Sequence, residues 1–68
     1  MPDRATLPDQ ETINQFIIRC HFDLAAVQAG LADYPALVHT HSSIPGAEDE
    51  SPLGAAGHVG NRAIAEYL

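Results

Sequence analysis

Apolar residues in the first third of the chain recur with the period of an α-helix. These residues, spaced i, i+3, i+4 and i+7, are Ile13, Phe16, Ile17 and Cys20. This spacing places all of them on one stripe of a helix. Asp9 stands just before the segment, where its carboxylate can accept hydrogen bonds from the exposed N–H groups of the first turn. The pattern predicts a helix that begins after Asp9 and buries one face.

A second helix is predicted to follow closely. Asp23 is a suitable N-cap for it. Leu24, Val27 and Leu31 then follow in helical phase. Pro35 ends this helix, because the residue before a proline avoids the helical region. Since about three residues join the two helices, we expect an antiparallel helix hairpin.

Residues 36–50 have the least regular pattern in the chain. Residues 37–41 alternate weakly between apolar and polar and are expected to be extended. Ile44-Pro45-Gly46 is a turn signal, and an acidic run follows it at residues 48–50. We expect a long surface loop here, with an open hairpin as the alternative.

The last part of the chain returns to the helical period in two short segments. Ser51 is placed to cap a helix that has Pro52 at its first position, where the missing N–H is not needed. Gly60 suits the left-handed residue after a helix end, and Asn61 can cap the next helix. The apolar edge of this last helix consists of Ile64, Tyr67 and Leu68.

The order of motifs in residues 51–68 resembles one ankyrin repeat. Ser51-Pro52-Leu53 stands where that family has Thr-Pro-Leu, and Ala55-Ala56 matches its small helix interior. His58-Val59-Gly60-Asn61 resembles its glycine followed by histidine or asparagine. Gly54 and Phe22 depart from the pattern, at the places of the usual histidine and glycine. The resemblance implies an all-α fold of two stacked antiparallel helix hairpins, an ankyrin-like α-solenoid fragment with a long connecting loop.

The resemblance also divides the chain. An irregular lead-in covers residues 1–8, and one ankyrin-like repeat domain covers residues 9–68. Within it, a capping repeat spans about residues 9–38, the loop residues 39–50, and the second repeat residues 51–68. A repeat of this kind does not bury its apolar face alone. We therefore expect either an N-terminal fragment of a longer array or self-association through the edge Ile64, Tyr67 and Leu68.

The function that the resemblance implies is a non-catalytic protein–protein interaction module. In this family the partner surface lies on the projecting loop and the inner helices. The corresponding positions here are His39, Thr40, His41, Ser42, Ile44, Glu48, Asp49 and Glu50, with Gly54, His58 and Arg62 as further positions. The expected partner is another protein, which the sequence does not identify.

Composition excludes several other partner classes. The 68 residues include nine acidic and three basic side chains, a net charge of −6, and no lysine. Nucleic acids and anionic membrane surfaces both bind clustered basic side chains, so we expect neither as a partner. No run approaches the roughly 20 apolar residues of a membrane span, and the first ten residues lack the apolar core of a signal peptide. The lone cysteine suits a reducing compartment, and we expect a cytoplasmic protein.

Two histidines in the loop are candidates for metal binding. His39 and His41 point to one face if the segment is extended. Zinc would need a further ligand, for which His21, His58 or Glu48 are available. A small metal-binding protein is therefore an alternative function, although the spacing of a structural zinc site is missing.

The remaining reactive residue types do not form a catalytic pattern. Cys20, His21 and Asp23 have the chemistry of a nucleophilic site, but neighbours on a helix point in different directions. The acidic run at residues 48–50 would need a pocket that crowds or buries one carboxyl group, and no pocket is predicted. We expect no enzymatic activity, no catalytic residue and no cofactor.

Overall fold

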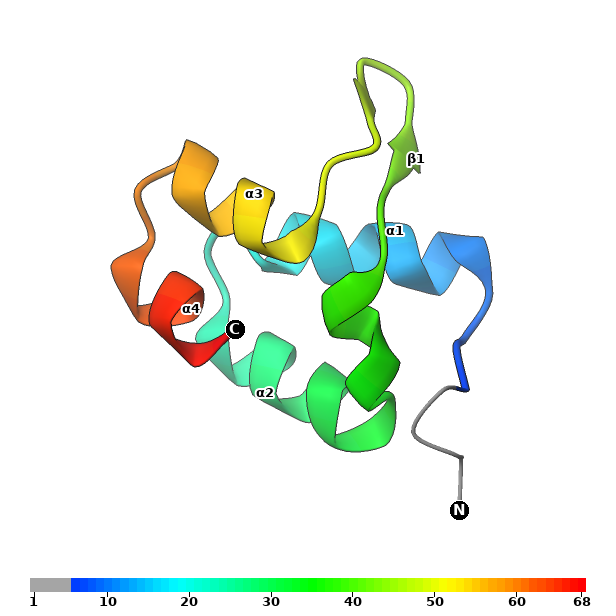
Figure 1. Ribbon diagram of the computed structural model, residues 1–68, viewed down its shortest axis with the longest axis horizontal. Coiled ribbons are helices and arrows are strands. Elements are labelled where there is room, and N and C mark those ends of the chain that lie inside the picture. Colours follow the sequence, from blue (N-terminus) through cyan, green and yellow to red (C-terminus); the bar gives the residue numbers. More distant parts are fainter. Residues whose placement is uncertain (1–5) are drawn as a thin grey trace.

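Four α-helices and one 3-10 helix form most of residues 6–68, the part of the chain that the computed structural model describes (Figure 1). The helices are α1 (Gln10–Arg19), α2 (Leu24–Asp33), η1 (Pro35–His39), α3 (Pro52–His58) and α4 (Arg62–Tyr67). Between η1 and α3, strands β1 (Ser43–Ile44) and β2 (Ala47–Glu48) pair as an antiparallel hairpin. The all-α prediction is confirmed. The first five residues of the predicted lead-in lie outside the described residues, and residues 6–9 have no regular structure.

The α-helices begin where the sequence predicts, because a polar side chain caps each of them. Each cap accepts a hydrogen bond from the backbone N–H three residues later; the caps are Asp9, Asp23, Ser51 and Asn61. The pKa of the Asp9 carboxyl is lowered, mainly by a hydrogen bond from the Thr12 side chain and further by one from the Thr12 backbone. Local sequence signals therefore determine the helix starts.

All the helices contribute to one apolar core. Its buried members are Ile13, Phe16, Ile17, Cys20, Val27, Leu37, Ala55, Ala56 and Ile64. The predicted apolar stripe supplies the first four of these residues. The small residues Ala55 and Ala56 of α3 pack against it. Close approach of α2 to α1 depends on Gly30, because a Cβ built there would lie only 2.8 Å from Cδ1 of Phe16. The lack of a side chain at this position makes room for the ring.

The helices form two pairs that each reverse direction at a short turn on the same side of the molecule (Figure 1). Helix α1 packs against both α2 and α3, and α4 packs against both α3 and α2. Helix η1 fills the space between α2 and α3. The extended segment expected at residues 37–41 is wrong for residues 37–39, which belong to η1. Burial of Leu37 in the core, at 2% exposure, draws this segment inward.

Candidate functional site

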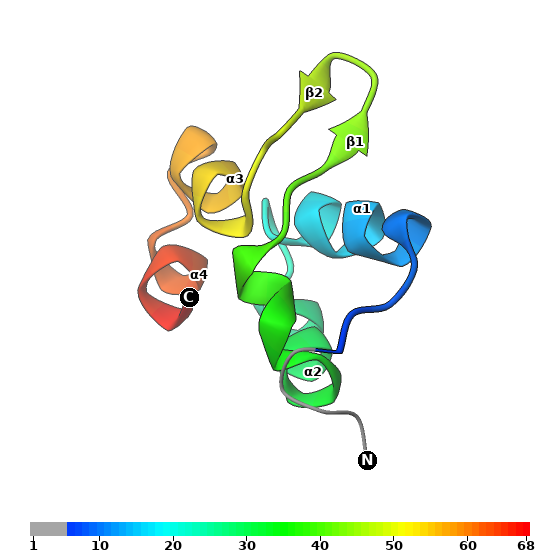
Figure 2. The same ribbon diagram turned by 45° about the vertical axis from the view of Figure 1, so that its right-hand side comes forward.

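The β1–β2 hairpin projects from the helices and is the most prominent feature of the surface (Figures 1 and 2). In its register Ser43 faces Glu48 and Ile44 faces Ala47. The tip is formed by Pro45 and Gly46, and the glycine has a φ of 85°, as the third position of a type II turn requires. The open-hairpin alternative therefore describes this segment, and an irregular loop does not.

A β-bulge closes the base of the hairpin. The N–H of Asp49 donates to the carbonyl of Ser42 at 2.8 Å, and the N–H of Ser42 donates to the carbonyl of Glu50 at 2.9 Å. Asp49 and Glu50 thus lie opposite the single residue Ser42. Such a bulge twists the strands and ends their pairing. Asp49 has a φ of 62°, in the left-handed region that aspartate tolerates better than most residues.

Polar side chains of α1 hold β1 in place. Asn14 Oδ1 accepts from the Ser43 N–H at 2.9 Å, and Asn14 Nδ2 donates to Ser43 Oγ at 3.1 Å. One turn earlier, Gln10 Nε2 donates to the carbonyl of His41 at 3.2 Å. Sequence reasoning did not identify Gln10 and Asn14 as functional positions. Nothing local marks them, since they are ordinary polar residues outside the apolar stripe.

The acidic run has three separate roles rather than forming one cluster. The Glu48 carboxylate accepts from the Gly46 N–H at 2.8 and 3.1 Å and supports the turn. Glu50 Oε1 lies 3.2 Å from His21 Nε2, at the junction of α1 and α2. Asp49 is exposed in the bulge. Of the three, only Asp49 directs its charge to solvent without a hydrogen bond from another described residue.

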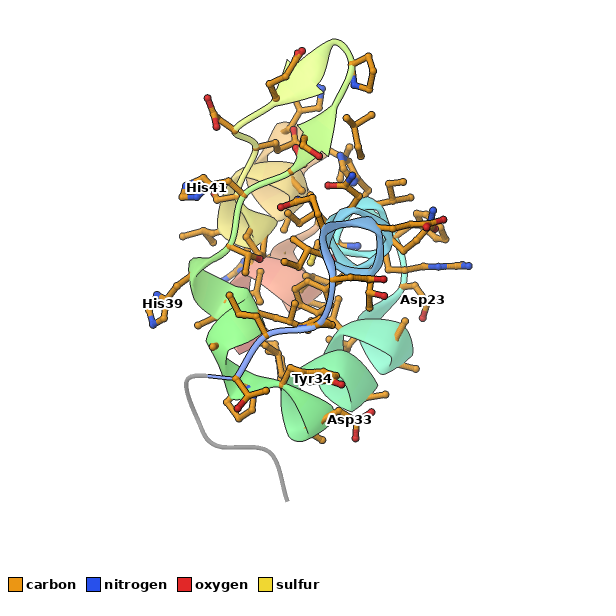
Figure 3. The ribbon with its side chains drawn as sticks, turned by 90° about the vertical axis from the view of Figure 1, so that its right-hand side faces the viewer. Asp23, Asp33, Tyr34, His39 and His41 are labelled. Carbon is orange, nitrogen blue, oxygen red and sulfur yellow. The ribbon has the colours of Figure 1, made fainter. Side chains whose placement is uncertain are left out.

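Two of the predicted contact residues are in the interior. Thr40 is 7% exposed and donates from Oγ1 to the carbonyl of Leu37, and Ser42 is 3% exposed. The prediction that Thr40 and Ser42 are part of an exposed partner surface is wrong, because buried hydroxyl groups do not reach a partner. His39 and His41 are exposed and both point outward on one side of the molecule (Figure 3).

The other predicted positions are at or near the surface. Ile44 is half-buried, and Gly54, His58 and Arg62 are exposed. The guanidinium Nε of Arg62 donates to Glu66 Oε1 at 2.7 Å, which keeps both charges on the outside of α4.

The three residues of the predicted self-association edge also differ in their exposure to solvent. Ile64 is fully buried in the core, so its assignment to an exposed edge is wrong. Tyr67 is 47% exposed, and Leu68 is half-buried against the core. The helical period of α4 places Ile64 inward, because this short helix packs on both α2 and α3.

The candidate chemical sites gain no support from the geometry. Within residues 6–68, no three His, Cys, Asp or Glu side chains come together as metal ligands would. Cys20 is fully buried, and the loss of solvation raises the pKa of its thiol to about 12. Beside it, the His21 ring is turned toward backbone carbonyls of α1 and toward Glu50. Cys20 and His21 therefore do not form a nucleophile and base pair.

No helix in the described part of the chain is long and apolar enough to cross a membrane. The chain matches no protein-family model, no curated protein and no solved structure. The ankyrin resemblance therefore stays a prediction from the sequence.

Proposed function

We propose that this chain is a non-catalytic protein–protein interaction module and that the β1–β2 hairpin carries its partner surface. The observation that supports this is a projecting hairpin tied to the helical body at two places. Asn14 holds β1 through Ser43, and His21 holds the base through Glu50. Because these contacts order the hairpin before a partner arrives, binding loses less conformational entropy than with a free loop.

The chemistry of the hairpin surface suits recognition of a protein. Pro45 at the tip is exposed and apolar, Ile44 beside it is half-buried, and Asp49 adds an exposed negative charge. His41 is exposed next to the base of the hairpin (Figure 3). An apolar tip with an acidic side on a chain of net charge −6 favours a partner with a basic patch around an apolar contact.

A matched pair of charge variants tests the proposal. Asp49→Asn removes the exposed charge of the β-bulge and keeps a residue that tolerates the left-handed conformation. Asp33→Asn makes the same change at the exposed end of α2, away from the hairpin (Figure 3). Immobilised wild type and both variants are used to capture partners, which are identified by mass spectrometry and then measured by titration.

We expect a partner that binds the wild type and Asp33→Asn equally and binds Asp49→Asn roughly five- to tenfold more weakly, a loss of about 1–1.4 kcal/mol. Equal affinity of the two variants for every captured partner would contradict the assignment of the hairpin.

Exposed apolar side chains on the α3–α4 pair favour a second candidate, a structural unit that self-associates. Leu53, Val59 and Tyr67 are 56%, 49% and 47% exposed. A second copy of the chain that covered them would remove apolar surface from water. Light scattering over a range of concentrations tests this. Self-association predicts a mass that rises with concentration in the wild type and less in Tyr67→Ser, and a constant monomer mass eliminates it.

A further inference from the structure

His21 lies where three elements meet. Its Nδ1 is 3.0 Å from the carbonyl oxygens of both Ile17 and Ile18, at the C-terminal end of α1. Its Nε2 is 3.2 Å from Glu50 Oε1, at the base of the hairpin. Its own carbonyl accepts from Nδ2 of Asn61, the N-cap of α4, at 3.3 Å. One residue thus connects α1, the hairpin and the start of α4.

Both ring nitrogens of His21 face atoms that accept hydrogen bonds. The carbonyls of Ile17 and Ile18 carry no proton, so Nδ1 must be the donor toward them. The Glu50 carboxylate is also an acceptor, so Nε2 must donate as well. Only the doubly protonated imidazolium donates from both nitrogens.

We propose that protonation of His21 fastens the base of the β1–β2 hairpin to α1 and that deprotonation releases it. A neutral ring has one proton left and cannot donate from both nitrogens; in the released state this proton lies at Nδ1, toward the two carbonyls of α1. The lone pair of Nε2 then faces the Glu50 carboxylate, and the contact becomes repulsive. The hydrogen bonds of Asn14 continue to hold β1, so the base of the hairpin loosens while β1 stays attached to α1.

The neighbouring charges leave Glu50 as the ionic partner of this ring. On the α1–α2 turn, Arg19 pairs with Asp23 at 3.8 Å, and its guanidinium lies 5.7 Å from the centre of the Phe22 ring. The Cys20 thiol is uncharged, because burial raises its pKa to about 12. Of the remaining groups on α3 and α4, His58 and Arg62 are exposed, and Arg62 pairs with Glu66.

The sign of the pH effect follows from the charge that the contact requires. The His21–Glu50 contact stabilises the hairpin base while the ring is charged. Histidine side chains change charge between about pH 5 and 8. The stabilisation is therefore present at the acidic end of this window and is lost as the pH rises through it.

The contacts of the His21 ring lie within the chain and need no partner. Control of binding by pH rests on the proposed function, whereas order at the hairpin base does not. We therefore choose a test on the isolated protein, which can fail while partner capture succeeds, or the reverse.

The test compares the wild type with Glu50→Gln and His41→Gln at about pH 5.5 and about pH 8. In Glu50→Gln the side-chain amide can donate to a neutral Nε2, so the anchor no longer needs the charged ring. His41→Gln removes an exposed histidine beside the hairpin and serves as the matched control. Backbone ¹⁵N relaxation reports the order of the Asp49 and Glu50 amides, and thermal unfolding reports overall stability.

In the wild type and in His41→Gln we expect these amides to become more mobile at the higher pH. Their Tm should fall by roughly 2–4 °C more than that of Glu50→Gln over the same window. Equal order of the wild-type hairpin at both pH values overturns the inference, and so does an unchanged pH response in Glu50→Gln. If Glu50→Gln does not fold, His21→Gln replaces it, because a side chain that does not titrate must abolish the response.

Discussion

At the scale of single residues, two helical glycines have opposite surroundings. Gly30 of α2 is packed against the Phe16 ring, whereas a Cβ built on Gly57 of α3 would have no atom within 4 Å beyond its chain neighbours and its own helix backbone. Alanine is favoured over glycine inside a helix by about 1 kcal/mol. At Gly30 packing against Phe16 opposes this preference, and at Gly57 the preference acts alone.

We therefore expect Gly30→Ala and Gly57→Ala to change the free energy of unfolding in opposite directions. Crowding of Phe16, at 2.8 and 3.0 Å from the new Cβ, should outweigh the helix preference and lower stability by about 1 kcal/mol. Gly57→Ala should raise stability by about 0.5–1 kcal/mol. Urea unfolding measures both. A gain for Gly30→Ala would mean that the ring moves aside at little cost.

The thiol of Cys20 should be inert in the folded protein. It is fully buried, and its pKa is raised to about 12 because the interior does not solvate the thiolate. Labelling by a maleimide at neutral pH is expected to be at least tenfold slower in the native protein than in urea, consistent with access only through unfolding. Equal rates in the two conditions would show that the cysteine is accessible from the native surface.

At the scale of elements, the hairpin depends on residues far from it in the sequence. Its strands have two residues each, too few to be stable as a hairpin in water. The contacts of Asn14 and His21 with Ser43 and Glu50 supply the order that the strands lack. A substitution of a hairpin-contacting residue on α1 should therefore alter the order of the hairpin.

Replacement of Asn14 by alanine tests this dependence. The Ser43 N–H loses its acceptor, and its hydrogen exchange should become about fivefold faster, which corresponds to about 1 kcal/mol. Gln15→Ala, at the next and exposed position of α1, is the control and should leave the exchange unchanged. Exchange at the wild-type rate in Asn14→Ala would mean that the hairpin is ordered by its own strands.

At the scale of the whole molecule, the two helix pairs share one core. Ile64 of α4 is fully buried together with Ile17 of α1, Val27 of α2 and Ala55 of α3. A chain of 68 residues has little stability to lose, since small domains bury a smaller share of their surface. The helix pairs are therefore expected to unfold together.

Ile64→Ala should show this coupling. Truncation of a fully buried isoleucine costs about 2–5 kcal/mol. Hydrogen exchange should accelerate in α1 as much as in α4, because loss of the shared core exposes both. Tyr67→Ala, which changes a half-exposed neighbour on the same helix, should cost much less. Retained protection in α1 would instead show that the first pair is stable by itself.

The sequence by itself determined the four α-helices and most of the core. The caps Asp9, Asp23, Ser51 and Asn61 act on N–H groups three residues away, and the apolar stripe of α1 follows the helical period. Both signals are local, so they can be read without knowledge of the fold. The turn at Pro45-Gly46 was predicted for the same reason.

Only the tertiary structure decided which of these residues reach the surface and which contact each other. Thr40, Ser42 and Ile64 are buried in the folded chain. Asn14 meets Ser43 across 29 positions, and His21 meets Glu50 although nothing in the pattern links them. Such contacts depend on how the helix pairs pack, and no local signal encodes that packing. The hairpin was therefore visible in the sequence as a turn, but its anchors on α1 were not.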